Sequence, residues 1–291
     1  MNGTIIKAMS GFYYIETAGE VFQTRARGNF RDRGIKPLVG DDVEFEPNGL
    51  IMAINERRNE LIRPSIANVD QAVVVASVAE PKLSLNLLDR MISVLEYHNI
   101  KPILYFSKLD LLPDEDLDET QNIFEYYERI GYAVINNLNL EPLKPLFKNN
   151  VTVFTGQTGA GKSTLLNELD TTLDLKTDAI SDKLGRGKHT TRHVELHHVF
   201  DGLIADTPGF SAVDLTQIDS VVSLRETFVE MRELQGECKF RECTHTHEPG
   251  CAVKASLEEG FILESRYDDY LQFIEEIENR REEYIKKAKK G

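Results

Sequence analysis

The feature that most constrains the fold of this chain is a glycine-rich run at residues 156–163, which reads GQTGAGKS. It fits the phosphate-binding pattern G-x-x-x-x-G-K-[ST] at every fixed position. The apolar residues 151–154 before it predict a buried strand, and residues 163–167 after it predict the start of a helix. Glycines let backbone N–H groups turn inward around phosphate oxygens, and the helix N-terminus adds its positive dipole end. The run therefore predicts a nucleotide phosphate site between a strand and a helix.

Several residues in and after the glycine-rich run are suited to binding a magnesium nucleotide. We expect Lys162 to reach the β- and γ-phosphates and the Ser163 hydroxyl to ligate Mg²⁺. Asp206 and Gly209 of the sequence DTPG follow the short apolar run 203–205, where a carboxylate can complete the magnesium shell and a backbone N–H can meet the γ-phosphate. The residues predicted to bind at the phosphate loop are Gly156, Gln157, Thr158, Gly159, Ala160, Gly161, Lys162, Ser163 and Thr164.

A third motif, Ser107-Lys108-Leu109-Asp110, follows the apolar residues 103–106 and resembles the guanine-reading N-K-x-D motif of GTPases. The Asp110 carboxylate can accept hydrogen bonds from guanine N1 and N2 together, which adenine does not offer, while the Lys108 stem packs along the loop and base. Alone, such a carboxylate would more often belong to an ordinary turn. Ser107 replaces the usual Asn, and a hydroxyl makes only one of the two amide hydrogen bonds. We therefore expect a guanine preference with reduced affinity.

The order of these motifs is unusual. In ordinary GTPases the phosphate loop comes first and the guanine motif last, whereas here Asp110 precedes Gly156. The nucleotide domain is therefore predicted to be circularly permuted, which is feasible because domain termini often lie close together. The segment after Gly209 then leads directly into the C-terminal region, so a γ-phosphate-dependent shift could act on that region.

All three cysteines lie in one short segment with the pattern Cys238-x₄-Cys243-x-His245-x₅-Cys251. Three thiolates and one imidazole suit tetrahedral Zn²⁺, and an odd number of cysteines cannot all pair as disulfides. His247 competes for the fourth position. The pattern leaves no open coordination position and no nearby general base, so we predict a structural site that stabilises a small helical domain. The alternative is a set of free thiols beside surface histidines.

The motif order, with the cysteine cluster behind it, resembles the circularly permuted GTPases of the RsgA/YjeQ family, which act in late maturation of the bacterial small ribosomal subunit. The resemblance covers nearly the whole chain. It implies an α/β fold in which a circularly permuted P-loop GTPase domain is flanked by an N-terminal OB-like β-barrel and a C-terminal helical zinc-binding domain. It also implies GTP/GDP, Mg²⁺ and one structural Zn²⁺ as cofactors, and His245 as the fourth zinc ligand. The implied partners are the small (30S) subunit and its 16S rRNA, with GTP hydrolysis that the subunit stimulates and that times release.

The chain divides into three predicted domains. Residues 1–68 alternate short β-rich runs with turns, which favours a small barrel, and the resemblance favours an OB-like over an SH3-like one. Residues 69–220 alternate strand and helix patterns, as in a doubly wound sheet. Residues 221–291 are helical, with apolar stripes that we interpret as core-facing. The five runs expected in the barrel are residues 4–8, 11–15, 21–26, 42–45 and 50–54.

The net charge of −14 is unexpected for an RNA-binding protein, but it is unevenly distributed. The first 68 residues carry nine basic and nine acidic side chains, so all of the excess acidity lies after them. A loop in this segment gathers basic side chains with an aromatic one and could hold phosphates and stack a base. A solvated charged loop is an equal alternative. The residues concerned are Arg25, Arg27, Phe30, Arg31, Arg33 and Lys36, around Asp32. A basic C-terminal tail, Lys286 to Lys290, could also contact RNA.

Hydrolysis needs a residue that orients water. The position after D-x-x-G, often Gln in GTPases, is Phe210, which cannot do so. Residues 185–192 (GRGKHTTR) lie where the first switch segment belongs, so Thr190 or Thr191 is predicted to bind Mg²⁺ and the γ-phosphate. His189 resembles the water-orienting histidine proposed for the family, and an imidazole has a suitable pKa. A contact between His189 and rRNA is the alternative. We expect slow turnover without the ribosomal partner.

Composition gives the remaining expectations. A hydrophobic fraction of 41% and a mean hydropathy of −0.33 are typical of a soluble globular chain, and neither a membrane-spanning run nor a signal-peptide core is evident. We therefore expect a cytoplasmic monomer with no membrane contact. Two other functions remain open: a P-loop ATPase or kinase acting on a small molecule, which Ser107 supports, and a non-catalytic RNA-binding scaffold, which Phe210 supports.

Overall fold

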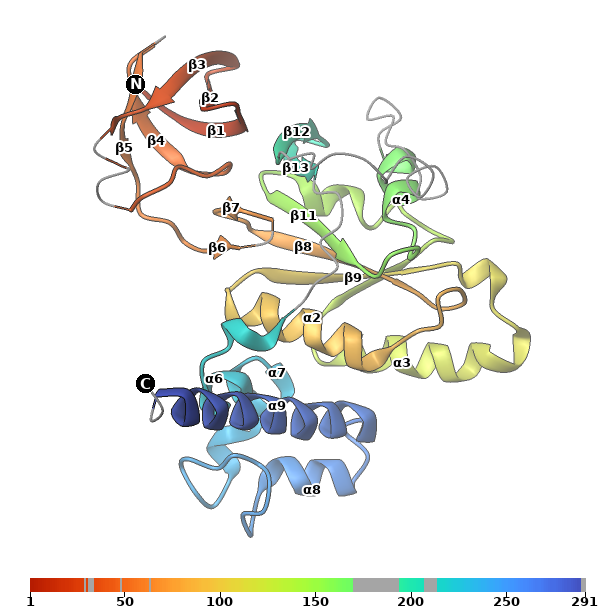
Figure 1. The fold of residues 1–291 in the computed structure, drawn as a ribbon. Helices are drawn as coiled ribbons and strands as arrows, with labels where there is room; N and C mark the ends of the chain where they lie inside the picture. The colour runs from red at the N-terminus through yellow and green to blue at the C-terminus, as the bar shows by residue number, and fades with distance from the viewer. Residues whose placement is uncertain are drawn as a thin grey trace.

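The computed structural model describes residues 1–28, 30, 34–47, 49–62, 64–169, 194–206 and 214–288, and only the backbone of Asp206 and of residues 281–288. Three parts follow one another along the chain in Figure 1: a β-barrel in red and orange, an α/β domain from pale orange through yellow and green to teal, and a group of helices in cyan and blue. No helix within these ranges is long and apolar enough to cross a lipid bilayer.

The N-terminal part is a closed five-stranded barrel, as the sequence predicts. Its strands pair in the order β1-β2-β3-β5-β4, and β4 returns to pair with β1. Alternating residues such as Ile5, Ile15, Val43 and Ile51 are completely buried inside it, because successive side chains of a strand point to opposite faces. The strands are β1 (Asn2–Met9), β2 (Phe12–Thr17), β3 (Glu20–Ala26), β4 (Asp42–Phe45) and β5 (Leu50–Ile54).

The central part is a doubly wound sheet with the strand order β10-β9-β8-β11-β13-β12. Its strands are parallel except β12, which is antiparallel to β13 at the edge. The phosphate-loop strand β11 therefore lies at the centre, between β8 and β13. The strands are β8 (Gln71–Ser77), β9 (Lys101–Ser107), β10 (Ala133–Asn136), β11 (Val151–Gly156), β12 (Glu195–Val199) and β13 (Gly202–Asp206).

Helices cover both faces of this sheet. Val74 of β8 belongs to the same core as Leu88 and Ile92 of α2, whereas its neighbours Val73 and Val75 belong to the core that includes α4. The apolar run of β8 is thus buried on both sides, which explains its lack of alternation. Figure 1 shows α2 and α3 on the face towards the C-terminal helices and α4 on the other face. The helices are α2 (Leu85–Tyr97), α3 (Leu117–Arg129) and α4 (Lys162–Leu169).

The barrel and the central sheet are joined edge to edge. Strand β1 pairs with β12 through Lys7 and Glu195, so an eleven-stranded sheet runs through both parts. The Lys7 ammonium lies 2.7 Å from the Glu195 carboxylate, and His198 Nε2 lies 2.8 Å from Glu16. Two short strands, β6 (Glu60–Leu61) and β7 (Ile66–Ala67), form the connection to β8.

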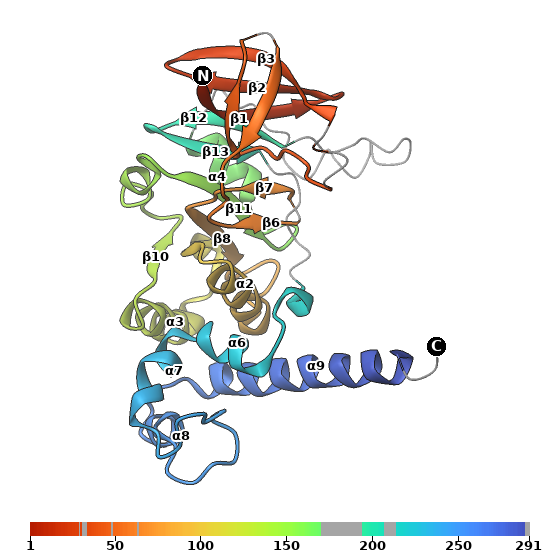
Figure 2. The same ribbon diagram turned by 90° about the vertical axis from the view of Figure 1, so that its left-hand side faces the viewer.

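The C-terminal part is helical and packs against α2 (Figure 2). The apolar residues from Leu224 to Leu234 lie on two short helices, because Phe228 is extended and the Thr227 hydroxyl donates to the Leu224 carbonyl at 2.6 Å. Leu224, Phe228 and Met231 are nevertheless completely buried. The helices are α6 (Val221–Glu226), α7 (Val229–Leu234), α8 (Ala252–Glu258) and α9 (Glu264–Ala288).

A buried charged cluster fastens this part to the central sheet. The Arg266 guanidinium of α9 is completely buried and donates to Asp89 of α2 at 2.7 Å and to Glu230 of α7 at 2.8 Å. The Tyr127 hydroxyl of α3 donates to the same Asp89 oxygen at 2.5 Å. Four helices therefore meet at one cation, and removal of Arg266 would leave the buried carboxyl groups of Asp89 and Glu230 without their cation.

Candidate functional site: a nucleotide site and a cysteine–histidine cluster

The phosphate loop has the backbone that its glycines allow. Gly156, Gly159 and Gly161 have φ values of 147°, 79° and 96°, a range that favours glycine. At Gly156 a Cβ atom would lie 2.1 Å from the carbonyl oxygen of Val75, so the neighbouring strand excludes any side chain. Helix α4 begins at Lys162, directly after the loop. The predicted succession of strand, glycine loop and helix is confirmed.

The Lys162 side chain folds over its own loop. Its ammonium donates to the carbonyl oxygens of Gly156 at 2.7 Å and of Gln157 at 2.9 Å. This places the cation above the loop where the phosphates are predicted to lie. Ser163 is half-buried in the first turn of α4 and Thr164 is exposed beside it.

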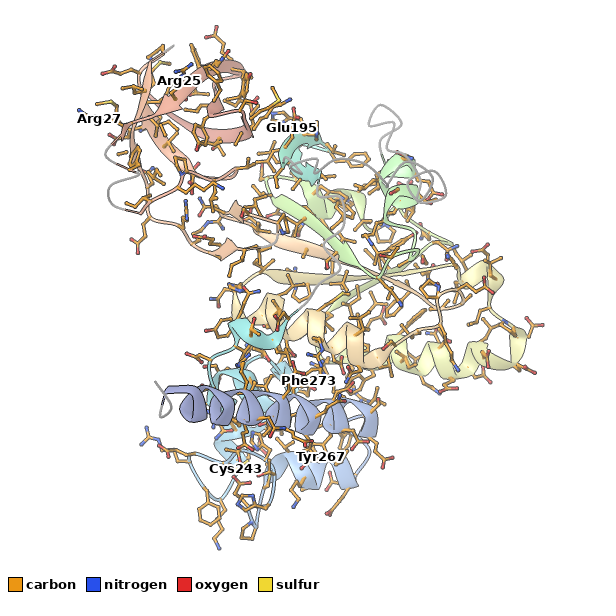
Figure 3. The ribbon with its side chains drawn as sticks, in the orientation of Figure 1. Arg25, Arg27, Glu195, Cys243, Tyr267 and Phe273 are labelled. Atoms are coloured by element: carbon orange, nitrogen blue, oxygen red, sulfur yellow. The ribbon has the colours of Figure 1, made fainter. Side chains whose placement is uncertain are left out.

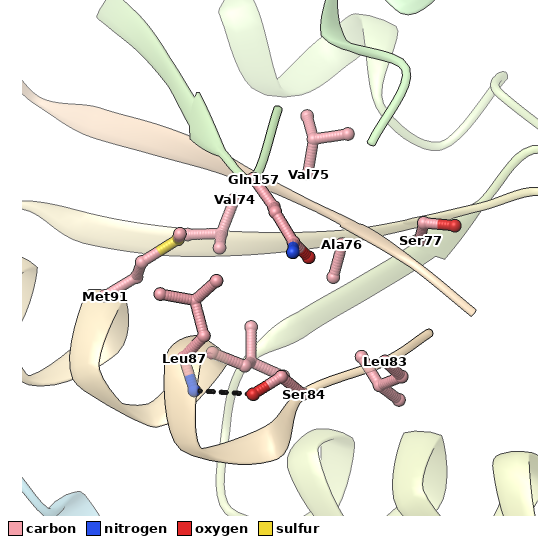
Figure 4. A pocket seen from close by; sticks show the side chains of 10 residues that line it. Val74, Val75, Ala76, Ser77, Leu83, Ser84, Leu87, Met91 and Gln157 are labelled. Carbon is pink, nitrogen blue, oxygen red and sulfur yellow. Dashed lines mark hydrogen bonds between the residues drawn. The ribbon is translucent and has the colours of Figure 1, made fainter. Parts of the chain in front are cut away.

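The Gln157 side chain lies elsewhere. Figure 4 shows it at a small apolar pocket between β8 and α2, with Val74, Leu87 and Met91. The Ser84 hydroxyl, which caps α2 by accepting from the Leu87 N–H at 3.3 Å, borders the same pocket. Gln157 thus contributes its backbone to the loop and packs its side chain against α2.

The predicted base motif lies against the phosphate loop, since β9 and β11 flank β8 and end at the same edge of the sheet. The Ser107 hydroxyl, which is buried, donates to the Ala160 carbonyl at 2.6 Å. Lys108 has a left-handed φ of 62°, and its ammonium donates to the Gly159 carbonyl at 2.9 Å and to the Glu80 carbonyl. The two loops are interlocked by side chain to backbone hydrogen bonds.

Asp110, which is predicted to read guanine, is exposed at the rim of this site. It is bound by Asn137, a residue that the sequence analysis did not predict. Asn137, directly after β10, donates through Nδ2 to the Asp110 carboxylate at 2.5 Å. Its Oδ1 accepts from the Leu109 N–H at 2.8 Å. An isolated Asn at a strand end carries little signal, and only the parallel pairing of β10 with β9 brings it to the base motif.

The side chains of several predicted site residues lie outside the part of the chain that the structure describes. Strand β13 ends at Asp206, as predicted, so the backbone of this residue follows the strand next to the phosphate loop strand. Its side chain lies outside the described residues, and so do Gly209, His189, Thr190 and Thr191.

The four predicted metal ligands come together in the C-terminal part. One ligand atom each from Cys238, Cys243, His245 and Cys251 lies within 4.8 Å of all the others. Cys243 and Cys251 are buried and His245 is completely so, whereas His247 is exposed outside the cluster. Figure 3 shows Cys243 and Tyr267 in this region, and the Tyr267 hydroxyl donates to the His245 carbonyl at 2.6 Å.

The donor set fits zinc. Zn–S bonds of about 2.3 Å in a tetrahedron place ligand atoms about 4 Å apart, which agrees with the observed spread. Burial raises the pKa of the Cys243 thiol to about 12 and also raises that of Cys251. Burial, followed by the nearby Arg225, lowers the pKa of His245 to about 4 and keeps its imidazole neutral. A bound cation deprotonates coordinating thiols, so the cluster is suited to a metal rather than to exposed thiol chemistry.

The barrel carries part of the predicted basic loop on its surface. A hollow of about 770 Å³ is lined by Arg27, Lys36 and Tyr13 among others. The Arg25 guanidinium lies 4.4 Å above the Phe12 ring. Figure 3 shows Arg25 and Arg27 on the barrel. Phe30 was expected to offer a stacking face, but it is 7% exposed and belongs to the hydrophobic core. Phe30 still lines the hollow, but Tyr13 is its more accessible, half-buried aromatic residue.

The interlocked loops on a sheet whose strands occur in permuted order define a circularly permuted GTPase. The family model described as RsgA GTPase matches residues 54–216, and the RsgA N-terminal domain matches residues 2–51. The chain therefore belongs to the RsgA family of GTPases.

Relatives agree over the full length. The small ribosomal subunit biogenesis GTPase RsgA of Streptococcus mutans is 54% identical, with 100% of both chains covered, and that of Enterococcus faecalis is 53% identical, with 99% of both covered. The crystal structure of YloQ, a circularly permuted GTPase, has a TM-score of 0.80 at 44% identity and covers 96% of this chain and 95% of its own. YjeQ from Thermotoga maritima has a TM-score of 0.82 at 30% identity, covering 95% and 98%.

Proposed function

We propose that the protein is a GTP hydrolase that binds the small (30S) ribosomal subunit and uses hydrolysis to time its own release during late subunit maturation. The observation that carries this proposal is the interlock of the base motif with the phosphate loop through Ser107 and Lys108. It joins a guanine-reading carboxylate and a phosphate site into one unit. The names of the full-length relatives, small ribosomal subunit biogenesis GTPases, supply the partner.

In this proposal the phosphate loop, with the residues from Gly156 to Thr164, cradles the phosphates. Lys162 exchanges its bonds to the loop carbonyls for phosphate oxygens, which carry more negative charge. Ser163 and Asp206 hold Mg²⁺, together with Thr190 or Thr191. Magnesium supplies charge neutralisation between the β- and γ-phosphates.

Water attack requires a group that Phe210 cannot provide, and we assign this role to His189, in the segment before β12. Strand β12 pairs with β1 of the barrel, so contacts that move the barrel can act on the segment that carries His189. A subunit-bound barrel thereby stimulates hydrolysis. Without the subunit we expect turnover on the order of 10⁻⁴ to 10⁻² per second.

The flanking parts bind the subunit. The hollow beside Arg27 and Lys36 offers cations and an aromatic ring to 16S rRNA. The Cys238, Cys243, His245 and Cys251 cluster holds one structural Zn²⁺ and so fixes the helices of the C-terminal part. We assign residues 1–68 to the RNA-binding barrel, 69–220 to the GTPase domain and 221–291 to the zinc-binding domain, in a cytoplasmic monomer.

The test is hydrolysis of GTP and of ATP by the full chain, with and without 30S subunits. Three proteins are compared: the wild type, His189→Ala, and His197→Ala as a matched histidine control on β12. We expect GTP-specific turnover that rises with 30S and falls only in His189→Ala. Turnover indifferent to 30S, or a preference for ATP, would contradict the proposal. Stimulation that survives in His189→Ala would assign this histidine to RNA contact.

A further inference from the structure

The basic hollow of the barrel is bordered by the loop of residues 36–41, whose two ends are held in different ways. The Asp41 end belongs to the barrel backbone, because the Ile5 N–H of β1 donates to the Asp41 carbonyl at 2.9 Å. The other end carries Lys36, an exposed cation of the hollow, and continues into Pro37, which has no N–H to donate. Lys36 also lines a second hollow of about 240 Å³ beside the turn between β1 and β2, so its position shapes both.

Arg57, which follows β5 and lies outside both hollows, holds the Lys36 end of this loop. Its guanidinium donates to the completely buried Asp41 carboxylate twice, from Nε to Oδ1 at 2.7 Å and from Nη2 to Oδ2 at 2.8 Å. Nη2 also donates to the Lys36 carbonyl at 2.7 Å, and Nη1 donates to Glu60. The Asp41 carboxylate accepts a further bond from the Leu38 N–H at 2.7 Å. One planar cation therefore joins the two ends of the loop.

This set of bonds requires a guanidinium. Its donors lie in a rigid fork that matches the two oxygens of the Asp41 carboxylate and still leaves an N–H for the Lys36 carbonyl. A lysine ammonium is a single point charge on a flexible stem, so it can pair with the buried carboxylate without fixing the carbonyl as well. Arg57→Lys thus keeps the charge of the pair and removes the geometry.

The segment that carries Arg57 is itself fixed to the start of the GTPase sheet. The side-chain amide of Asn59 donates to the Val69 carbonyl at 2.7 Å and accepts from the Val69 N–H at 2.9 Å, just before β8. Arg57 therefore reaches into the barrel from a rigid base. The backbone of Lys36 is placed relative to the GTPase sheet as well as to the barrel.

We propose that Arg57 is a positioning residue for RNA binding by the barrel, because it holds the loop that presents the Lys36 cation to an RNA phosphate. The inference rests on the proposed function, since it deepens the assignment of the hollow to 16S rRNA. A loop that is ordered before binding loses less conformational freedom on binding, and this preorganisation adds affinity. Arg57 makes no contact with RNA in this assignment and acts through Lys36.

The test is equilibrium binding of the full chain to 30S subunits at one fixed salt concentration, for the wild type, Arg57→Lys, Lys36→Ala and the double variant. Arg58→Lys is the matched control, because this neighbouring guanidinium is largely exposed and pairs with Asp70 instead. We expect Arg57→Lys to weaken binding by about 10-fold and Arg58→Lys to bind as the wild type does. In the Lys36→Ala background, Arg57→Lys should cause no further loss, since its effect passes through Lys36.

The other outcomes separate the inference from the proposed function. Wild-type affinity in Arg57→Lys would overturn the inference, and so would losses that add in the double variant, which a merely structural role would produce. If Arg57→Lys melts at a lower temperature than the wild type, Arg57→Gln combined with Asp41→Asn, which leaves no buried charge unpaired, is judged by the same outcomes. A wild type that does not bind 30S subunits would contradict the proposed function itself. A wild type that binds, with Lys36→Ala unaffected, would overturn only the inference.

Discussion

At the scale of single residues, the phosphate loop depends on the absence of a side chain. Gly156 combines a φ of 147° with a position where a Cβ would meet the Val75 carbonyl at 2.1 Å. Gly131 has a φ of 103°, but no atom lies within 4 Å of its would-be Cβ. Substitutions at these two glycines therefore distinguish the effect of backbone strain, which both positions have, from that of steric exclusion, which only position 156 has.

We predict that Gly156→Ala destabilises the protein more than Gly131→Ala, by about 1–3 kcal/mol, and abolishes GDP binding. The extra loss arises because β8 and β11 must separate to admit the methyl group. Urea unfolding of both variants gives the difference in free energy of unfolding. Equal destabilisation would show that the backbone conformation alone matters at position 156.

The sequence predicts those parts of the site whose residues lie close together in the chain. The glycines, Lys162 and the cysteine spacing identify their roles without a structure, because each motif is read within about fifteen residues. Asn137 acts 27 residues from its partner Asp110 and depends on strand pairing, so its sequence neighbourhood carries no sign of it. Phe30 shows the opposite case, in which a residue in a charged loop turns out to be core.

At the scale of elements, the packing of α9 on α2 is governed by buried charge. Asp89 has one oxygen bonded to Arg266 and Tyr127, while its other oxygen has no hydrogen-bond partner among the described residues. Burial, opposed by Arg266 and assisted by Asp269, raises the pKa of Asp89 from 3.8 to about 7. Glu230 lies on the other side of Arg266 and competes for its charge.

This raised pKa predicts a pH dependence of stability. The folded state binds a proton that the unfolded state releases, so Asp89 contributes stability that is full below about pH 4 and is lost as the pH rises to about 7. The loss should be roughly 1–4 kcal/mol. The measurement is the free energy of unfolding against pH for the wild type and for Asp89→Asn, which should lack this slope. In Asp269→Asn the slope should move to lower pH, because a neighbouring negative charge is gone. Identical slopes in all three proteins would contradict the assignment.

The metal cluster makes a second prediction at this scale. Cys243 and Cys251 belong to the same hydrophobic core as residues of α6, α7 and α9, so loss of a bound metal should loosen these helices together. A chelator should lower the melting temperature by about 5 °C or more and release about one zinc ion per chain. Cys243→Ser should melt at the lower temperature and should not respond to the chelator. His247→Ala is the control and should behave as the wild type does.

At the scale of the whole molecule, the barrel covers an edge of the GTPase sheet. Strand β12 would be an exposed edge without β1, and exposed edges associate through their unpaired backbone groups. Sequence patterns predict both parts, because strand alternation and motif order are local. They cannot predict that Lys7 pairs with Glu195, since that register joins residues far apart in the chain.

We predict that a chain beginning at Asn59, which lacks the barrel, self-associates through β12 as its concentration rises. Light scattering after gel filtration measures the mass, and the full chain should stay monomeric. Replacing His198 with Lys in the shortened chain should reduce the association, because charged side chains disfavour edge pairing. A shortened chain that remains monomeric would show that β12 is protected in another way.

The permuted strand order also fixes when the protein can acquire its ligand. Synthesis proceeds from the N-terminus, so the base-reading strands through Asn137 leave the translating ribosome before Gly156 exists. The strand that carries the phosphate loop must then enter between β8, already made, and β13, still to come. An unpermuted GTPase makes its phosphate loop first. In this chain both nucleotide-binding motifs exist only after Ser163 has been made, so the barrel and the strands β8, β9 and β10 are synthesised before nucleotide can act on folding.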